Sequence, residues 1–249
     1  MDGRTAHRAV ADVTAAMGAF LAAGTWLCVT TLPDAAPQHL TLAAGLAAGA
    51  GVIGGAAASV LRRDPPLCTP ADRVTLVRAV LVACCAALTV AGLMAGSVPG
   101  GIIAVLGTTA FLLDAVDGRV ARFTGTASAA GSRLDTDTDG ALVLVLSCAT
   151  AGTTGPWTLG LGLMYYAFLA AGWFRPSLRE PLPPNMARKV IGAFQPAALL
   201  LALIPGVPPA LGRTAVAVAF MLLGFSFGRD IVELERLRRD DLAAVVPRA

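Results

Sequence analysis

Long apolar segments occupy most of this chain, and they restrict its fold more than any other feature of the sequence. Of the 249 residues, 56% are hydrophobic and only 14% are charged, which is too apolar for an ordinary soluble domain. Several segments come close to the ~20 residues that a helix needs to cross the hydrocarbon of a membrane. We therefore predict an all-α integral membrane bundle with about eight spans. The predicted spans are residues 11–31, 40–61, 75–95, 99–118, 135–152, 157–174, 189–205 and 210–228, separated by short breaks rich in Pro and Gly.

The positively charged residues indicate how this bundle is oriented. If the N-terminus is cytoplasmic, all of the 19 Lys and Arg residues except Arg213 fall on the cytoplasmic side, as the positive-inside rule expects. This predicts a protein of the plasma (inner) membrane with both termini in the cytoplasm. The net charge of +3 is explained by this topology and by anionic headgroups, so it indicates membrane lipids rather than nucleic acid as partners.

The first two segments are each open to two interpretations. Arg4 and Arg8 before an apolar run also fit a secretory signal peptide, but the length of the run and the lack of a small-x-small cleavage site favour an uncleaved helix. In the second segment, Gly45-x-x-x-Gly49 and Gly51-x-x-x-Gly55 would allow close packing against a neighbouring helix or a second subunit. Simple Gly/Ala-rich composition explains these glycines equally well.

Four aspartates gather where two of the predicted spans meet. The segment reads Asp114-x-x-Asp117-Gly118-x-x-Ala121-Arg122, then eight residues, then Gly131-x-x-x-Asp135-x-x-x-Asp139. On a helix, steps of three and four residues place each pair of carboxylates on one face. Unpaired carboxylates in or near hydrocarbon are costly, so four of them together indicate a cationic partner. A hard divalent metal ion is the natural candidate.

This pattern resembles the signature of the CDP-alcohol phosphotransferase (CDP-alcohol phosphatidyltransferase) family of integral membrane enzymes, and every fixed position of the signature is filled. The resemblance implies a six-helix catalytic core, from about Pro70 to about Arg239, preceded here by two additional transmembrane helices. We therefore expect a two-helix membrane extension at 1–63, the core at 64–239 and a cytoplasmic tail at 240–249. A homodimer is likewise an expectation from the family.

The resemblance also implies roles for the residues of the motif. Asp114, Asp117 and Asp135 would hold Mg²⁺ or Mn²⁺, and Asp139 would be both a metal ligand and the general base. Gly118, Ala121 and Gly131 would border the cytidine of the substrate, and Arg122 would contact its pyrophosphate, which suits a forked guanidinium. The alternative roles are helix packing for the three small residues and topological anchoring for Arg122.

Two stretches outside the motif carry weaker indications. Thr75 and Arg78 look like the Thr-x-x-Arg element that opens the family's first core helix near the nucleotide, although an interfacial anchor fits as well. Arg188 and Lys189 stand where related enzymes with phosphorylated acceptors carry basic residues, and a helix N-terminus would add to the binding of a phosphate. The Gly before the Lys and a Thr at position 192 are missing here, so these residues are either acceptor-binding or positive-inside anchors. Arg133, Arg175 and Arg179 could enlarge the same basic patch.

The predicted function is metal-dependent transfer of a phosphatidyl group from a CDP-alcohol, CDP-diacylglycerol in the first place, to the hydroxyl of a small polar acceptor, with release of CMP. A phosphorylated acceptor such as glycerol phosphate or inositol phosphate is favoured by Arg188 and Lys189. A serine-type acceptor is favoured by residues 117–126, which resemble the phosphatidylserine synthase branch. A metal or cation transporter and a catalytically silent membrane scaffold are the alternatives from other classes.

Two other patterns predict no separate site. Asp135-x-Asp137-x-Asp139-Gly140 matches the opening of a calcium-binding loop, but Leu146 stands where the bidentate Glu is needed and an apolar helix is expected there. On that helix Asp137 would point away from Asp135, toward the surface or a supporting position. The five cysteines (Cys28, Cys68, Cys84, Cys85 and Cys148) have no zinc-like spacing and are predicted to be structural thiols. Residues 229–241 are predicted to extend the last helix along the membrane surface or to form a solvated tail.

Overall fold

The structure is a computed structural model, and it describes residues 3–33, 37–63, 68–123, 125, 128–174 and 186–245. Within these ranges the chain forms eight α-helices and one 3-10 turn, and it contains no strand. The elements are α1 (Gly3–Thr31), α2 (Gln38–Leu61), α3 (Pro70–Met94), α4 (Gly100–Phe123), α5 (Ala129–Thr154), η1 (Pro156–Thr158), α6 (Leu159–Phe174), α7 (Met186–Leu203) and α8 (Pro209–Val245).

The predicted all-α membrane bundle is confirmed, and each predicted span coincides with one helix. Among the described residues, four helical segments are long and apolar enough to cross a membrane: Thr5–Thr31, Gln38–Leu61, Pro70–Met94 and Pro209–Arg229. Gly100–Val116 and Lys189–Leu203 are shorter apolar stretches. The number of spans therefore remains a prediction. α8 continues as helix to Val245, well beyond its apolar part.

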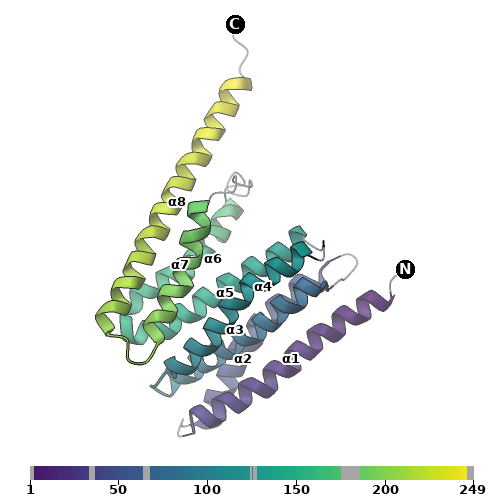
Figure 1. Cartoon of the computed structure of the whole chain (residues 1–249), viewed down its shortest axis with the longest axis vertical. Helices are drawn as coiled ribbons and strands as arrows, with labels where there is room; N and C mark the ends of the chain where they lie inside the picture. Colours follow the sequence, from purple (N-terminus) through teal and green to yellow (C-terminus); the bar gives the residue numbers. More distant parts are fainter. Residues whose placement is uncertain are drawn as a thin grey trace.

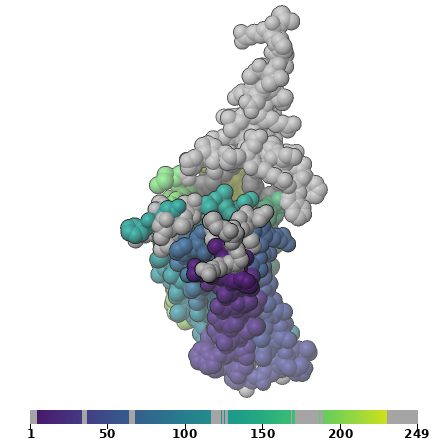
Figure 2. Space-filling model, turned by 90° about the vertical axis from the view of Figure 1, so that its right-hand side faces the viewer, coloured from purple at the N-terminus to yellow at the C-terminus, as the bar shows by residue number. Residues whose placement is uncertain are grey.

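α3 is the central helix of the bundle. Of its most apolar 18-residue window, 72% is buried, against 22% for α1 and 28% for α2. α1, α2, α4 and α5 all pack against α3, while α7 packs against α4, α5 and α8. Figure 1 shows the helices side by side, with α1 beginning and α8 ending at the same end of the molecule. Figure 2 shows α1, in purple, on the outside of the bundle.

Small residues bring α2 close to α3. A methyl group added to Gly45 would lie 2.7 Å from the carbonyl oxygen of Ala87, and one added to Gly49 would lie 2.6 Å from that of Ala83 and 2.3 Å from the Phe20 ring of α1. Gly51 and Gly55, by contrast, have nothing within 4 Å of such a methyl group. The first glycine pair is therefore a packing surface between helices, since membrane helices associate mainly through close van der Waals contact.

We expect Gly49→Ala to destabilise the bundle and Gly51→Ala to leave it as stable or more stable. Both changes gain the same helix propensity, so they differ in whether the new methyl group meets the backbone of α3. Overpacking of this kind costs about 1–3 kcal/mol. Thermal unfolding of the two purified variants in detergent measures the difference. Equal melting temperatures would show that α2 adjusts its distance from α3 without strain.

The first turns of α3 and α5 are fixed by capping residues at the same end of the bundle. Thr69 is the N-cap of α3; its hydroxyl accepts a hydrogen bond from the Asp72 N–H (3.2 Å), and Asp72 accepts one from the Thr69 N–H (2.8 Å), which completes a capping box. Ser128 caps α5 by accepting a hydrogen bond from the Gly131 N–H at 3.0 Å. These caps position the first turns of α3, which carries Arg78, and of α5, which carries Asp135 and Asp139.

Candidate active site

Three of the four motif aspartates come together between α4 and α5. Asp114 lies on α4, and Asp135 and Asp139 lie one turn apart on α5. One carboxylate oxygen from each lies within 4.8 Å of the other two. Their side chains are 39%, 37% and 47% exposed, respectively, so that Asp139 is the most accessible of the three. The cluster can thus be reached from outside the protein while its oxygens stay close to one another.

Arg78 of α3 contacts all three carboxylates. Its side chain is only 1% exposed, and its Nη1 lies 3.2 Å from Asp114 Oδ1. The same guanidinium donates hydrogen bonds to Oδ1 of Asp135 and to Oδ1 of Asp139. A buried arginine is stable only when charged partners of this kind satisfy it. The guanidinium in turn keeps the two α5 carboxylates facing α3 and α4.

The donor set of this cluster fits a hard divalent cation. Its ligand atoms are all carboxylate oxygens, the type that Mg²⁺ and Mn²⁺ prefer. With three ionised carboxylates and one guanidinium, about two negative charges are left over, which a single divalent ion would neutralise. Asp114, Asp135 and Asp139 therefore form a group that could hold a metal ion.

The remaining motif residues on α4 are placed only through their backbone. Asp117, Gly118, Ala121 and Arg122 belong to the last two turns of α4, one to two turns beyond Asp114, and their side chains lie outside the described residues. Gly131, on the first turn of α5, faces α3: a methyl group there would lie 3.5 Å from Asp72 Oδ1. Its small size lets the start of α5 approach the start of α3.

Sequence reasoning missed the contact of Arg78 with the aspartates. The Thr-x-x-Arg stretch suggested either a nucleotide contact or an interfacial anchor, and in the structure both side chains are buried. Thr75 is 4% exposed and its hydroxyl donates a hydrogen bond to the Ala71 carbonyl at 3.2 Å. A usable signal existed, because an arginine on an otherwise apolar membrane helix needs a partner of opposite charge, and the motif holds four acids.

The residues proposed for the acceptor lie at the start of α7. Lys189 is exposed on the first turn of this helix, while the side chain of Arg188 lies outside the described residues. Arg175 and Arg179 also lie outside the described residues, whereas Arg133, on α5 two residues before Asp135, is exposed. Figure 1 shows the start of α7, the end of α4 and the start of α5 toward the same end of the bundle.

Asp137 points away from the other α5 aspartates, as predicted from the helical period. It is exposed and accepts a hydrogen bond of 2.8 Å from the Tyr165 hydroxyl on α6. A cavity of about 370 Å³ lies beside this pair, lined by α5, α6 and the open glycines of α2, Gly51 and Gly55. Because α5 is one continuous helix from Ala129 to Thr154, the calcium-loop interpretation is excluded.

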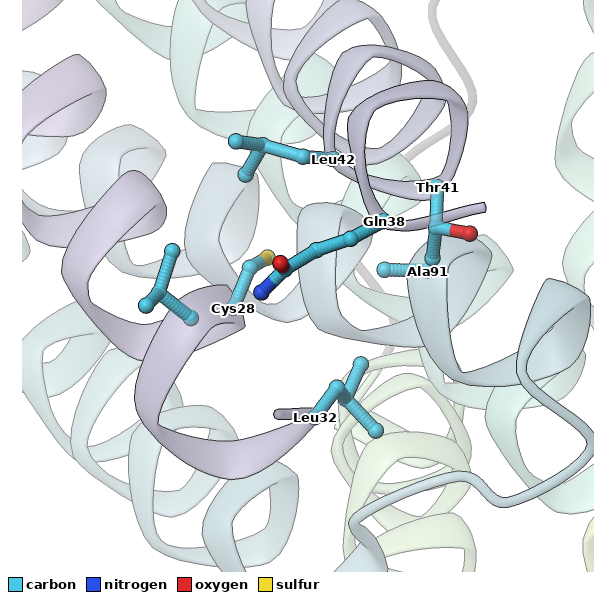
Figure 3. Close-up of a pocket in the computed structure, with 7 residues that line it drawn as sticks. Cys28, Leu32, Gln38, Thr41, Leu42 and Ala91 are labelled. Atoms are coloured by element: carbon cyan, nitrogen blue, oxygen red, sulfur yellow. The ribbon is translucent and has the colours of Figure 1, made fainter. Parts of the chain in front are cut away.

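None of the five cysteines forms a disulfide, and Cys28, Cys84 and Cys85 are buried. Burial, together with the nearby Asp12 and Asp72 carboxylates, raises the pKa of the Cys68 thiol to about 12, so it carries no charge at neutral pH. Figure 3 shows Cys28 with Gln38 and Leu32 around a small pocket where α1 ends and α2 begins. This pocket has room for about 10 Å³, too little for a substrate. The prediction of structural thiols agrees with these surroundings.

The model of the CDP-alcohol phosphatidyltransferase family matches residues 68–227, which is more than half of the chain and includes α3 to α7, the whole aspartate cluster and Arg78. No curated protein and no solved structure matches the chain. The all-helical membrane fold, the metal-binding type of carboxylate cluster and the family match agree. The protein therefore belongs to the CDP-alcohol phosphatidyltransferase family, membrane transferases that move a substituted phosphate group from a CDP-alcohol to an alcohol acceptor in phospholipid synthesis.

Proposed function

We propose that this enzyme uses CDP-diacylglycerol as donor and transfers its phosphatidyl group to the hydroxyl of a small phosphorylated alcohol, with release of CMP. The observation that carries the proposal is the cluster of Asp114, Asp135 and Asp139 around Arg78 within the family match. Asp117, one turn from Asp114, would complete the ligand set. Mg²⁺ or Mn²⁺ bound there would neutralise the donor pyrophosphate and favour departure of CMP.

Asp139 is proposed as the general base. Its side chain is the most exposed of the three, and its Oδ1 accepts a hydrogen bond from Arg78. In the reaction the acceptor oxygen forms a bond to the phosphatidyl phosphorus and loses its proton to Asp139. The bond from that phosphorus to the bridging oxygen breaks, and its electron pair leaves with CMP. Gly118, Ala121, Gly131, Arg122, Thr75 and Arg78 would border the CDP moiety, with Arg78 acting through the carboxylates that it contacts.

The topology proposed from the charges fits the position of the cluster. α1 begins and α8 ends at the same end of the bundle at which α4 ends and α5 begins (Figure 1). If the positive-inside rule holds, this end is cytoplasmic, where CDP-activated substrates and polar acceptors are available. We accordingly propose a plasma-membrane enzyme with a catalytic core at about 64–239, a cytoplasmic tail at 240–249 and a homodimeric assembly. The family match argues against the transporter, because the family is one of transferases. The cluster of three aspartates argues against a catalytically silent scaffold.

The choice of acceptor rests on basic residues toward the same end of the bundle as the cluster (Figure 1). Lys189 and Arg133 are both exposed, at the starts of α7 and α5, and the positive end of a helix favours a phosphate. Glycerol phosphate and inositol phosphate have the required chemistry. The serine-type acceptor, suggested by residues 117–126 alone, is the second candidate.

The function is tested by measuring CMP release from the purified protein in lipid vesicles with CDP-diacylglycerol, Mn²⁺ or Mg²⁺, and one acceptor at a time. The panel contains glycerol phosphate, inositol phosphate, inositol and serine. We expect release that requires the metal and one of the two phosphorylated acceptors. Release with serine alone would show that the enzyme uses the serine-type acceptor, the second candidate. Failure with every acceptor, from protein shown to be folded, would refute the proposed donor and acceptor classes together.

If Lys189 binds the acceptor phosphate, Lys189→Gln should raise the KM for the phosphorylated acceptor about tenfold and leave the KM for the donor unchanged. The reason is the loss of one charge-assisted hydrogen bond, worth about 1.5–3 kcal/mol when desolvated. The measurement is initial-rate kinetics with each substrate varied in turn. Arg213→Gln, predicted to lie on the opposite side of the membrane, is the control. An unchanged acceptor KM would make Lys189 a topological anchor.

A further inference from the structure

The two N-terminal helices, which lie outside the family match, are joined to the active-site end of α3 by a buried ion pair. Arg63, two residues after the end of α2, donates hydrogen bonds from Nη1 and Nη2 to the Asp72 carboxylate at 2.7 and 3.0 Å. The Arg63 side chain is 12% exposed and that of Asp72 only 2%. A bidentate pair in this degree of burial has a well-defined geometry and is strongly coupled.

Asp72 also fixes the first turn of α3. Its Oδ2 accepts hydrogen bonds from the Thr69 N–H and the Thr69 hydroxyl, both at 2.8 Å. Asp72 therefore joins three parts of the molecule: the end of α2 through Arg63, the beginning of α3 through Thr69, and the α5 N-terminus, since Gly131 lies beside its Oδ1. Loss of Arg63 would leave a buried carboxylate without its cation, which favours rearrangement of this turn.

This turn is close to the catalytic cluster. Arg78 follows Asp72 by six residues on the same helix, about 9 Å along its axis. Thr75 and Leu76, which lie between them, and most of the α3 residues beyond Arg78 are buried in the core. A packed helix moves as a rigid element, so a shift or rotation of its first turn displaces the guanidinium of Arg78. That guanidinium contacts Asp114, Asp135 and Asp139 simultaneously, an arrangement with little tolerance for movement.

We infer that Arg63 is a positioning residue of the transferase: through Asp72 it sets the depth and rotation of α3 and thereby places Arg78 within the aspartate cluster. The N-terminal helix pair is then a working part of the catalytic unit rather than an appended membrane anchor. The inference rests on the proposed function of the cluster. It assigns no contact with substrate to Arg63.

A second ion pair between the N-terminal helices and α3 offers a matched control. Arg73 donates a hydrogen bond of 2.9 Å from Nε to Asp12 Oδ2 of α1, but the Arg73 and Asp12 side chains are 54% and 25% exposed. Exposed pairs contribute little, because water competes for both charges. Asp12→Asn therefore removes an ion pair to the same turn of α3 without leaving a buried charge.

The test compares wild-type protein with Arg63→Gln, Arg63→Lys, Arg78→Gln, the Arg63→Gln/Arg78→Gln double variant and Asp12→Asn, all full length in lipid vesicles. For Arg63→Gln we expect kcat to fall about 10- to 100-fold, since displacements of about 1 Å have effects of this size, with a smaller change in the donor KM. Arg63→Lys should recover part of the loss. Asp12→Asn should stay within about twofold of wild type.

The double variant distinguishes positioning from simple destabilisation. If Arg63 acts through Arg78, Arg63→Gln should lower kcat by less than about twofold once Arg78 is already replaced. The inference would be overturned if the losses of kcat in the two single variants added fully in the double variant. It would also be overturned if Arg63→Gln lowered the melting temperature but left kcat of the folded protein at the wild-type value. Binding of Mn²⁺, followed by electron paramagnetic resonance without any substrate, gives a readout independent of turnover. With the guanidinium displaced from the carboxylates, Arg63→Gln should bind Mn²⁺ more tightly, as should Arg78→Gln; unchanged or weaker binding by Arg63→Gln would contradict the inference.

The proposed function and the positioning role of Arg63 can be refuted separately. Absence of CMP release by the wild type would refute the proposed donor and acceptor, while the Mn²⁺ measurement would still test the coupling of Arg63 to the cluster. Normal wild-type turnover with an unaffected Arg63→Gln variant would refute the positioning role alone.

Discussion

Replacing Asp139 by Asn should lower the rate of CMP release about 10²- to 10⁴-fold, the range that a positioned general base contributes. An amide of nearly the same shape can still accept a hydrogen bond from Arg78, but it cannot take the proton of the acceptor hydroxyl. The loss should appear in kcat, with the donor KM changed much less, because the step affected is the attack and not the binding of the donor. Initial rates at saturating donor and acceptor measure it.

Two controls separate the role of base from that of metal ligand. Asp137→Asn lies two residues away on the same helix, but Asp137 accepts its hydrogen bond from Tyr165 and is outside the cluster, so this variant should retain near wild-type activity. Raising Mn²⁺ or Mg²⁺ should not restore Asp139→Asn if the lost function is proton transfer. Recovery at high metal concentration would show that Asp139 serves only as a ligand.

Removal of divalent metal should abolish CMP release altogether, and adding Mg²⁺ or Mn²⁺ should restore it. Without a cation, the excess negative charge of the carboxylates would repel the pyrophosphate of the donor, because one guanidinium cannot neutralise three carboxylates. Chelation followed by titration with each metal measures the effect. Monovalent salt at the same ionic strength should not substitute, since the requirement is for a multivalent ion with oxygen ligands.

The same metal titration, carried out on variants, identifies which aspartates bind the metal. Asp114→Asn and Asp135→Asn should raise the metal concentration for half-maximal activity at least about tenfold, which corresponds to about 1.4 kcal/mol, because each removes one carboxylate oxygen of the cluster. Asp12→Asn, on α1, should leave that concentration unchanged. If elemental analysis shows that the chelated protein is free of metal and the protein is still fully active, the metal has no part in the mechanism.

The sequence predicted the helices well because membrane spans depend on length and apolarity alone. Eight apolar segments became eight helices, with differences of a few residues at most ends, and α4 and α8 continue past their apolar parts to Phe123 and Val245. The aspartate cluster was equally accessible, since Asp135 and Asp139 share a face of one helix and the motif unites them with Asp114. Local periodicity suffices for such features.

Contacts between helices that are distant in the sequence could not be predicted from the sequence pattern. Arg78 is 36 residues from Asp114 and 61 from Asp139, and nothing in the period of α3 shows which way its arginine faces, because the helix is apolar on all sides. The same holds for Tyr165 with Asp137, for Arg63 with Asp72, and for the difference between Gly49, packed against α3, and Gly51, which faces open space.

The sequence by itself therefore determined that this chain forms an all-helical membrane protein and that its carboxylates lie where two helices meet, because hydrophobicity and helical spacing are properties of short stretches. Only the tertiary structure decided which helix supplies the positive charge to that cluster and how the N-terminal pair is joined to it. These depend on the rotation and neighbours of each helix, which are set by close packing of small residues and by pairing of buried charges across the whole bundle.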